Sequence, residues 1–337
     1  MGIAFSSVPR LLRQRTPPQL PDDVVVDILS RIRVKTLCRF RCVSKGWYTL
    51  ISDNIVSVYK ARAEPLLVVG SRRDTSLRLI DMGGNVVKVI KNVGYVWKLI
   101  CTSRDNLVCV IGISCDVKVV DLANGEVLQT CKKTGLLGFG CTIPFSVYKI
   151  VYINPYLCEI LTVGDDVEWR PMQLPQNSNI SYARSPVVVN GVLHLLLRSQ
   201  LDGNGVLCFN LASEEWMKAI KGPPNVDLQK GDLSLSELNG SLCMVQPEDE
   251  SWVTNIWLLT NSNKSTWVKV FEIPLNSRGY YRVKPLRILP DGRLVFYNTH
   301  EKTDLSSVQI YDPHNWDFID APNALAGVHD TNFSPCS

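Results

Sequence analysis

Apolar residues recur at helical spacing in one part of the chain, between residues 20 and 53. The first segment there has apolar positions at i, i+1, i+4, i+5 and i+8, which form one helical face: Val24, Val25, Ile28, Leu29 and Ile32. Two shorter helices are predicted at about 35–43 and from Ser44, whose hydroxyl suits an N-cap. Three such helices cannot bury a core alone, so this module needs a partner or the rest of the chain.

From about residue 64 the pattern changes to short runs of β-branched and aromatic residues that alternate with turn residues. Such runs include 66–70, 77–81, 86–90, 107–111 and 117–121. No later stretch convincingly shows helical periodicity. Many short strands with regular turns predict an all-β sandwich, barrel or propeller.

A repeated segment favours the propeller. In each copy a strand ends in an acid or amide near a turn and another strand follows, and the copies at 158–173 and 256–271 are weaker. The six markers of this pattern lie 40 to 52 residues apart: Asp81, Asp121, Gly164, Asn210, Thr260 and Asp312. A four-stranded propeller blade has this length, so we predict a six-bladed propeller, with an irregular sandwich as the alternative.

Charge separates the two regions. Residues 1–63 contain 11 basic and four acidic residues, a net charge of +7, whereas the remaining 274 residues carry −3. Residues 1–19 contain three arginines and no acid, and we expect a disordered tail there, although Met1–Ser6 also fits the N-myristoylation pattern. Eleven cysteines without a C-x-x-C pair indicate free thiols in a reducing compartment, the cytoplasm and/or nucleus. No apolar run reaches the length of a membrane span.

A search for catalytic and ligand-binding patterns finds little. None of the four histidines has metal-ligand spacing, and His194, in an apolar run, is interpreted as a buried strand residue. The glycines of GLLGFG, 135–140, lack the lysine and helix of a phosphate loop and are interpreted as a turn between blades. Five tryptophans at strand positions are expected to pack within blades. Trp252 lies beside a loop and is the candidate for a recognition surface.

The helical segment resembles an F-box. Residues 20–53 read LPDDVVVDILSRIRVKTLCRFRCVSKGWYTLISD, with Leu20-Pro21, Ile28–Ile32, Arg39–Lys45 and Trp47 at the positions of that motif. Arg33, Gly46 and the segment 55–61 depart from the residues usual there.

The remainder is similar to the F-box-associated domain of the large plant F-box family. The shared segments occur in the same order: Gly138–Gly140, Tyr148–Val151, Glu159–Gly164, Trp169-Arg170, Asn190–His194, Leu207–Leu211 with Glu214-Glu215, Leu238–Cys243, Ile256-Trp257 and Trp267–Lys269. The turn 121–126 departs from the family pattern, and Gly83-Gly84 lacks the spacing of a kelch blade.

The resemblance implies a non-catalytic substrate receptor of an SCF-type (cullin–RING) ubiquitin ligase, with no cofactor. Its partners would be a Skp-family adaptor and an unknown target protein, without nucleic acid or membrane. The apolar residues expected to bind the adaptor are Leu20, Pro21, Ile28, Leu29, Leu37, Phe40, Val43 and Trp47.

The implied organisation is a basic tail at 1–19, an F-box domain at 20–62, a β-propeller-like domain at 63–325 and a flexible C-terminus at 326–337. Target-binding loops are expected at 72–75, 176–182, 201–204, 248–252 and 278–281. Three alternatives stay open: an F-box scaffold outside a ligase, a nucleic-acid binder using its basic helices, and a propeller with an enzymatic or sugar-binding central channel.

Overall fold

The chain divides into two units, Met1–Glu64 and Pro65–Ser337. A computed structural model describes Val24, Val25 and residues 66–336, with gaps at 83, 102–105, 145, 155, 166–167, 175–183, 198–204, 229–232, 249–251, 275–279, 301–304, 321–327 and 330. Val24 and Val25 are helical, as the apolar pattern predicts. The other residues of the three predicted helices lie outside the described ones, so the three-helix arrangement stays a prediction.

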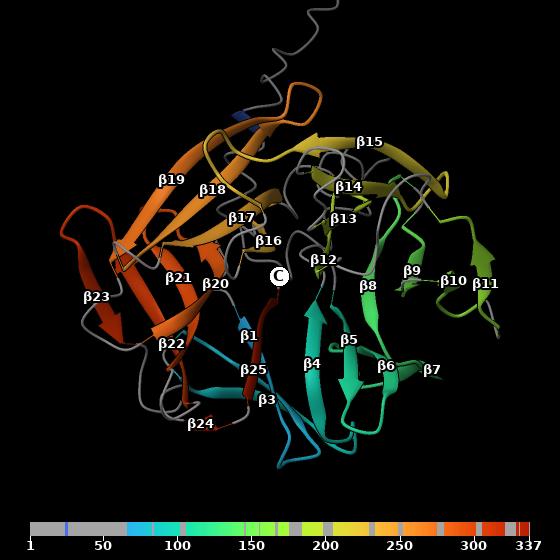
Figure 1. Cartoon of the computed structure of the whole chain (residues 1–337). Coiled ribbons are helices and arrows are strands. Elements are labelled where there is room, and N and C mark those ends of the chain that lie inside the picture. The colour runs from blue at the N-terminus through green and yellow to red at the C-terminus, as the bar shows by residue number, and fades with distance from the viewer. Residues whose placement is uncertain are drawn as a thin grey trace, which may run out of the picture. The chain divides into compact units, whose positions relative to one another are not determined.

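The second unit is a six-bladed β-propeller, as predicted (Figure 1). Its described strands form six antiparallel sheets, and each sheet is one blade. Blade 1 contains β4 (Val96–Cys101), β5 (Leu107–Gly112), β6 (Asp116–Asp121) and β7 (Val127–Lys132). Blade 2 contains β8 (Leu136–Cys141), β9 (Tyr148–Ile153), β10 (Cys158–Thr162) and β11 (Arg170–Met172). Blade 3 contains β12 (Arg184–Val189), β13 (Val192–Leu196), β14 (Gly205–Asn210) and β15 (Glu215–Lys221).

Blade 4 contains β16 (Ser234–Leu238), β17 (Ser241–Glu248), β18 (Val253–Asn261) and β19 (Thr266–Pro274). Blade 5 contains β20 (Tyr280–Ile288), β21 (Leu294–His300), β22 (Leu305–Asp312) and β23 (Asp317–Asp320), and the short β24 (Val328–His329) pairs with β22. Blade 6 contains β25 (Thr331–Cys336), β1 (Leu66–Ser71), β2 (Leu77–Ile80) and β3 (Val86–Ile90), in that order from the centre outward.

The two ends of the second unit meet in blade 6. β25 pairs with β1 along its whole length, from Leu66 opposite Cys336 to Ser71 opposite Thr331, and Figure 1 shows the two strands side by side. The expectation of a flexible C-terminus is therefore wrong for 331–336. This segment supplies the innermost strand that β1 needs, because β1 would otherwise present unpaired backbone groups at the channel.

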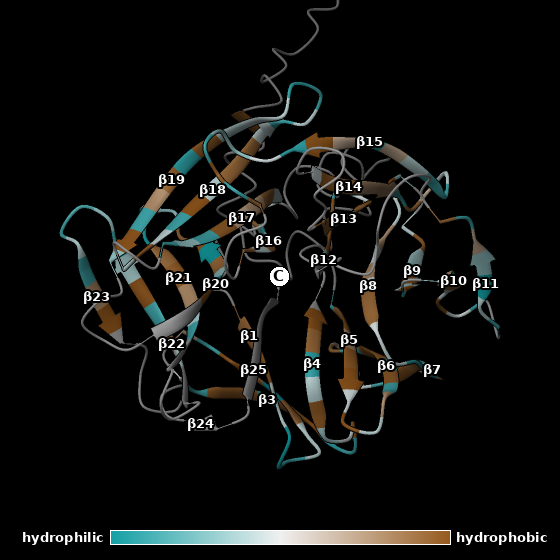
Figure 2. Cartoon of the chain, viewed as in Figure 1, coloured by the Kyte–Doolittle hydropathy of each residue, from teal (hydrophilic) through white to brown (hydrophobic). Residues whose placement is uncertain are grey.

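The hydrophobic core is divided into six clusters, one between each pair of neighbouring blades. Alternate residues of a strand point to opposite faces of its blade, so both faces are apolar. In β5, for example, Val108 and Val110 pack toward blade 6, whereas Cys109 packs toward blade 2. Figure 2 shows the resulting hydrophobic colouring along the inner strands and hydrophilic colouring in the peripheral turn between β22 and β23.

GLLGFG is not a turn between blades, because residues 136–141 form β8, the innermost strand of blade 2. A Cβ at Gly138 would lie 2.5 Å from Leu193 Cδ1, and one at Gly140 would lie 2.3 Å from Val188 Cγ1. Both glycines therefore allow β8 to approach blade 3 closely, which is a structural role.

The six sequence markers lie where the third strand of each blade ends. At most of these turns an Asp or Asn side chain accepts hydrogen bonds from the backbone N–H groups that follow. Asp121 Oδ1 accepts from Ala123 at 2.7 Å, Asn210 Oδ1 accepts from Ala212 at 2.8 Å, and Asp312 Oδ1 accepts from His314 at 2.9 Å. The repeat thus marks Asx-turns, which explains its preference for acids and amides.

Antiparallel order within each blade defines two faces of the propeller. The turns between first and second strands and between third and fourth strands lie on one face, called here the turn face. The connections between second and third strands and between successive blades lie on the opposite face, called here the loop face. Leu66 and Cys336, the paired ends of β1 and β25, both lie on the turn face.

Candidate functional site

The five loops predicted to bind a target all belong to the loop face. Residues 72–75, 201–204 and 248–252 connect second and third strands of blades 6, 3 and 4. Residues 176–182 and the segment from 278 join consecutive blades, although Tyr280 and Tyr281 already belong to β20. The sequence did not indicate this convergence, because it follows from the position of each loop within its blade. Most residues of these loops lie outside the described ones, so we place the loops by their flanking strands.

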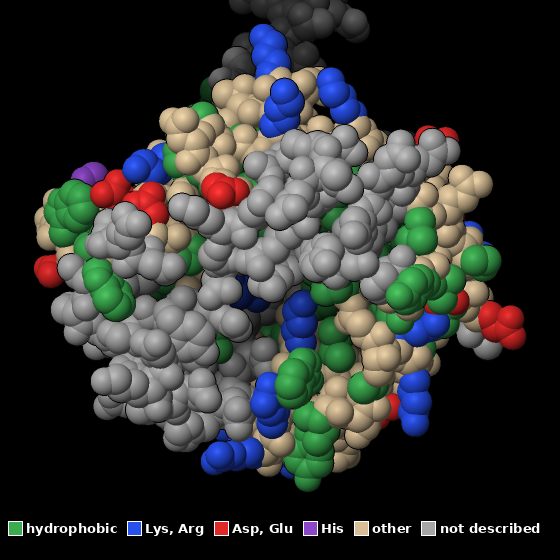
Figure 3. All heavy atoms as spheres, viewed as in Figure 1, with side chains coloured by type: hydrophobic (Ala, Val, Ile, Leu, Met, Phe, Trp, Pro, Cys, Tyr) green, Lys and Arg blue, Asp and Glu red, His purple; other side chains and the backbone are tan. Residues whose placement is uncertain are grey.

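An exposed aromatic cluster lies on the loop face of blade 1. Trp97 is 53% exposed, and the neighbouring Tyr95 and Ile113 are similarly exposed. The Arg72 guanidinium, from blade 6, lies 3.8 Å from the centre of the Trp97 ring, which is a cation–π contact. In Figure 3, hydrophobic and basic side chains gather over β4 and β5. Exposed aromatic and arginine side chains of this kind are typical of protein-binding surfaces.

Trp97 was not singled out from the sequence. It lies in the run YVWKLI, which predicts a strand residue like any other. The pairing of β4 with β5 shifts register between Val96 and Lys98, so Trp97 is the extra residue of a β-bulge. A bulge re-aims the side chain that it adds, and here that side chain is exposed.

Trp252, the predicted recognition residue, lies on the same face immediately before β18. Its side chain is 60% exposed. Its φ of 55° lies in the left-handed region, which residues other than glycine rarely adopt. Tyr156 and Leu157, between β9 and β10, are also exposed on this face. Exposed apolar side chains thus occur on the loop face of blades 1, 2 and 4.

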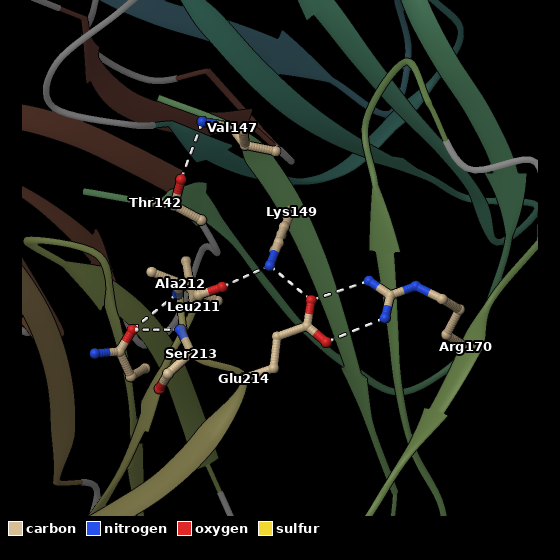
Figure 4. Close-up of polar contacts among 9 residues, drawn as sticks. Thr142, Val147, Lys149, Arg170, Leu211, Ala212, Ser213 and Glu214 are labelled. Atoms are coloured by element: carbon tan, nitrogen blue, oxygen red, sulfur yellow. Dashed lines mark hydrogen bonds and ion pairs between the residues drawn. The ribbon is translucent and has the colours of Figure 1, made fainter. Parts of the chain in front are cut away.

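The turn face of blades 2 and 3 is joined instead by an ion-pair network (Figure 4). Lys149 Nζ donates to Glu214 Oε1 at 2.6 Å and to the Leu211 carbonyl at 2.7 Å. Arg170 makes a bidentate pair with the same carboxylate, at 2.9 and 3.1 Å. These hydrogen bonds, first that from Arg170 and then that from Lys149, lower the pKa of Glu214. Lys149, Arg170 and Glu214 belong to three separate segments that each resemble the F-box-associated domain, and the structure brings them together in one network.

Burial favours the uncharged forms of three cysteine side chains and one histidine, which disfavours nucleophilic chemistry. Burial raises the pKa of the Cys131, Cys158 and Cys208 thiols to about 11, 12 and 11, so these thiols stay protonated at neutral pH. Burial also lowers the pKa of His194 to about 4. His194 is buried on β13, as predicted.

Within the described part of the chain, no group of three His, Cys, Asp or Glu side chains has the geometry of a metal site. No helix among those residues has the length and apolar character required to cross a membrane.

The residues predicted to bind an adaptor cannot be placed. All of them lie outside the described residues: Leu20, Pro21, Ile28, Leu29, Leu37, Phe40, Val43 and Trp47. Their proposed role therefore rests on the sequence alone.

Two regions of the chain match protein-family models. Residues 17–58 match the F-box domain, and residues 87–320 match the F-box associated beta propeller domain. Similar proteins include the F-box protein At5g49610 of Arabidopsis thaliana, which is 25% identical over 84% of this chain and 86% of its own length. The F-box protein At5g10340 of the same plant is 23% identical over 83% of this chain and 76% of its own length.

Among solved structures, TolB from Acinetobacter baumannii has a TM-score of 0.52 and 12% identity, and the match covers 85% of this chain and 71% of TolB. At this identity the likeness concerns the fold alone. The six antiparallel sheets define the class of protein, a six-bladed β-propeller. The family match covers most of the propeller, and the chain belongs to the F-box associated beta propeller domain family.

Proposed function

We propose that this chain is the substrate-recognition subunit of an SCF-type ubiquitin ligase. The observation that carries the proposal is the combination of an F-box match at 17–58 with an F-box associated propeller at 87–320 in one chain. The F-box would bind a Skp-family adaptor and, through it, a cullin–RING ligase. The propeller would hold the target, and other subunits would transfer ubiquitin.

The apolar residues of the F-box segment would form the adaptor contact. Ile28, Leu29 and Leu37 follow the helical pattern, and Trp47 supplies a large aromatic side chain of the type found at binding hot spots. The basic residues around them, which contribute to the net charge of +7 of residues 1–63, would accelerate association with an acidic adaptor more than they strengthen it.

The target would bind on the loop face of the propeller. Trp97, Tyr95 and Trp252 provide exposed aromatic surface there, and the five candidate loops have their flanking strand ends on this face. The paired strand ends Leu66 and Cys336 lie on the opposite, turn face. The free thiols of the described cysteines support a reducing compartment, the cytoplasm and/or nucleus.

Co-precipitation of the full chain with a Skp-family adaptor and a cullin tests this function. The double variant Leu29→Ala/Trp47→Ala should lose most adaptor binding, because truncation of a buried apolar contact costs about 2–5 kcal/mol. Trp252→Ala, on the propeller, is the matched control and should bind the adaptor as the wild type does. Undiminished adaptor recovery with the double variant would disprove the assignment. Adaptor binding without cullin would favour an F-box scaffold outside a ligase.

A further inference from the structure

A cavity of about 770 Å³ lies between blades 3 and 4. Strands β13, β14 and β15 form one wall, and β17, β18 and the turn 262–265 form the other. Both walls contain a register shift beside the cavity, one where Val206 and Cys208 of β14 pair with β15 and one between Leu259 and Asn261 on β18. The cavity adjoins the hydrophobic cluster between blades 3 and 4, to which Ile220 and Leu242 belong.

The lining of the cavity combines apolar side chains with one buried histidine. Val192, Ile220, Leu242 and Leu259 contribute hydrophobic surface. His194 also lines the cavity; only 7% of it is exposed, and its Nδ1 has no hydrogen-bond partner. The wall of the cavity is therefore less well satisfied at this point than a regular interface between blades.

The rim of the cavity is cationic. Lys218 and Lys221 of β15 and Lys264 of the β18–β19 turn line it, and all three are exposed. None of the three forms an ion pair with a described carboxylate. Figure 3 shows basic side chains gathered near β15 and the β18–β19 hairpin. Three cations beside apolar walls favour a ligand that has an acidic group at one end and an apolar body at the other.

We propose that this cavity binds a small amphipathic anion, with its acidic group at the three lysines and its apolar body between the blades. The volume falls in the range of pockets for single organic molecules. The exposed lysines attract a carboxylate, sulfonate or phosphate, and the apolar walls select a hydrocarbon or aromatic body. This site is separate from the loop face, since its turns belong to the turn face, and it does not depend on adaptor binding.

Calorimetric titration of the full chain with octanoate tests the proposal. Octanoate should bind saturably at one site, whereas octylammonium, which has the same body and the opposite charge, should not. Inorganic phosphate alone should bind much more weakly than octanoate, because it lacks the apolar body. Absence of saturable octanoate binding, or equal binding of octylammonium, would overturn the proposal.

Variants locate the binding. Lys218→Gln/Lys221→Gln/Lys264→Gln should weaken octanoate binding about tenfold. A matched triple variant of exposed lysines outside the cavity, Lys91→Gln/Lys132→Gln/Lys269→Gln, should leave the affinity unchanged. If both triple variants bind equally, octanoate binds elsewhere and the proposal fails.

Leu259→Trp should reduce binding by filling the cavity. His194→Phe keeps the approximate size of the side chain but removes the nitrogen, and it should not weaken octanoate binding, because the apolar body of the ligand and not its carboxylate lies beside this residue. A loss of octanoate affinity of about tenfold or more in His194→Phe would place the carboxylate at His194 and contradict the predicted pose. Circular dichroism of each variant checks that it is folded.

Discussion

The two faces of the propeller are built from connections of different chemistry. On the turn face, Asx-turns satisfy the backbone, and the Lys149–Glu214–Arg170 network joins two blades. On the loop face, Trp97, Tyr156 and Trp252 expose aromatic surface to solvent. The turn face also exposes Trp316, at 59%, but its ion-pair network joins two blades, whereas the loop face exposes three large aromatic side chains. Proteins commonly place binding residues on loops that a rigid scaffold positions.

The largest expected effect comes from breaking the ring that both faces share. Deletion of residues 331–337 removes β25 and leaves β1 without its inner neighbour. We expect the variant to lose its cooperative unfolding transition and to self-associate. The exposed strand edge promotes self-association. The loss of ring closure removes a contribution comparable to the whole stability of a domain, about 5–15 kcal/mol. Thermal unfolding and size-exclusion chromatography measure this.

Deletion of Ser337 alone is the control, since β25 ends at Cys336. If the longer deletion melted within about 2 °C of the wild type, the closure of blade 6 would not matter for stability.

An intermediate effect is expected on the turn face. Glu214→Gln leaves the buried Lys149 ammonium, whose side chain is only 10% exposed, without its carboxylate partner. We expect a loss of about 2–3 kcal/mol in the free energy of unfolding, measured by urea denaturation. Glu272→Gln, which breaks the exposed pair with Lys269, is the matched control and should cost at most about 0.5 kcal/mol. Equal losses in the two variants would contradict the special role of the network.

The same carboxylate predicts a pH dependence. The pKa of Glu214 in the folded chain is lowered from its ordinary value of 4.5, chiefly by Arg170. Its contribution to stability is thus fully present above pH 4.5 and is lost as the pH falls through the lower, folded pKa. The difference between wild type and Glu214→Gln should therefore shrink below about pH 4.5. A difference that grew on acidification would mean that the pKa shift has the opposite sign.

The smallest effect on stability is expected on the loop face. Trp252→Ala removes an exposed side chain and should change the free energy of unfolding by less than about 0.5 kcal/mol. Trp97→Ala also removes the contact with Arg72 and should cost about 0.5–1 kcal/mol. Urea denaturation distinguishes these values from that of Glu214→Gln. A loss of more than about 2 kcal/mol in Trp252→Ala would show that this residue is structural.

The blade count could be predicted from the sequence because Asx-turns require particular residues. Asp121, Asn210 and Asp312 each occupy the same position at the end of a third strand, where an oxygen must accept from the following backbone. A local chemical requirement leaves a local sequence signal, and this signal recurs in most of the six blades.

Long-range features could not be predicted in this way. The segment TNFSPC, 331–336, lacks a clear apolar alternation, and its strand forms only because β1 offers an edge far away in the chain. The exposure of Trp97 depends on a register shift between β4 and β5, which periodicity does not encode. His194 was correctly predicted as buried, but the cavity beside it is lined by residues of two different blades, which local periodicity does not encode.

The pairing of β25 with β1 has a consequence for synthesis on the ribosome. β1 begins at residue 66 and its partner begins at residue 331, so the first strand of the propeller emerges long before the strand that completes its blade. At about 5–20 residues per second, this delay lasts on the order of tens of seconds. During this delay, the nascent chain exposes the unpaired edge of β1, which chaperones could bind. A message truncated before codon 331 would yield a product in which that edge stays unpaired.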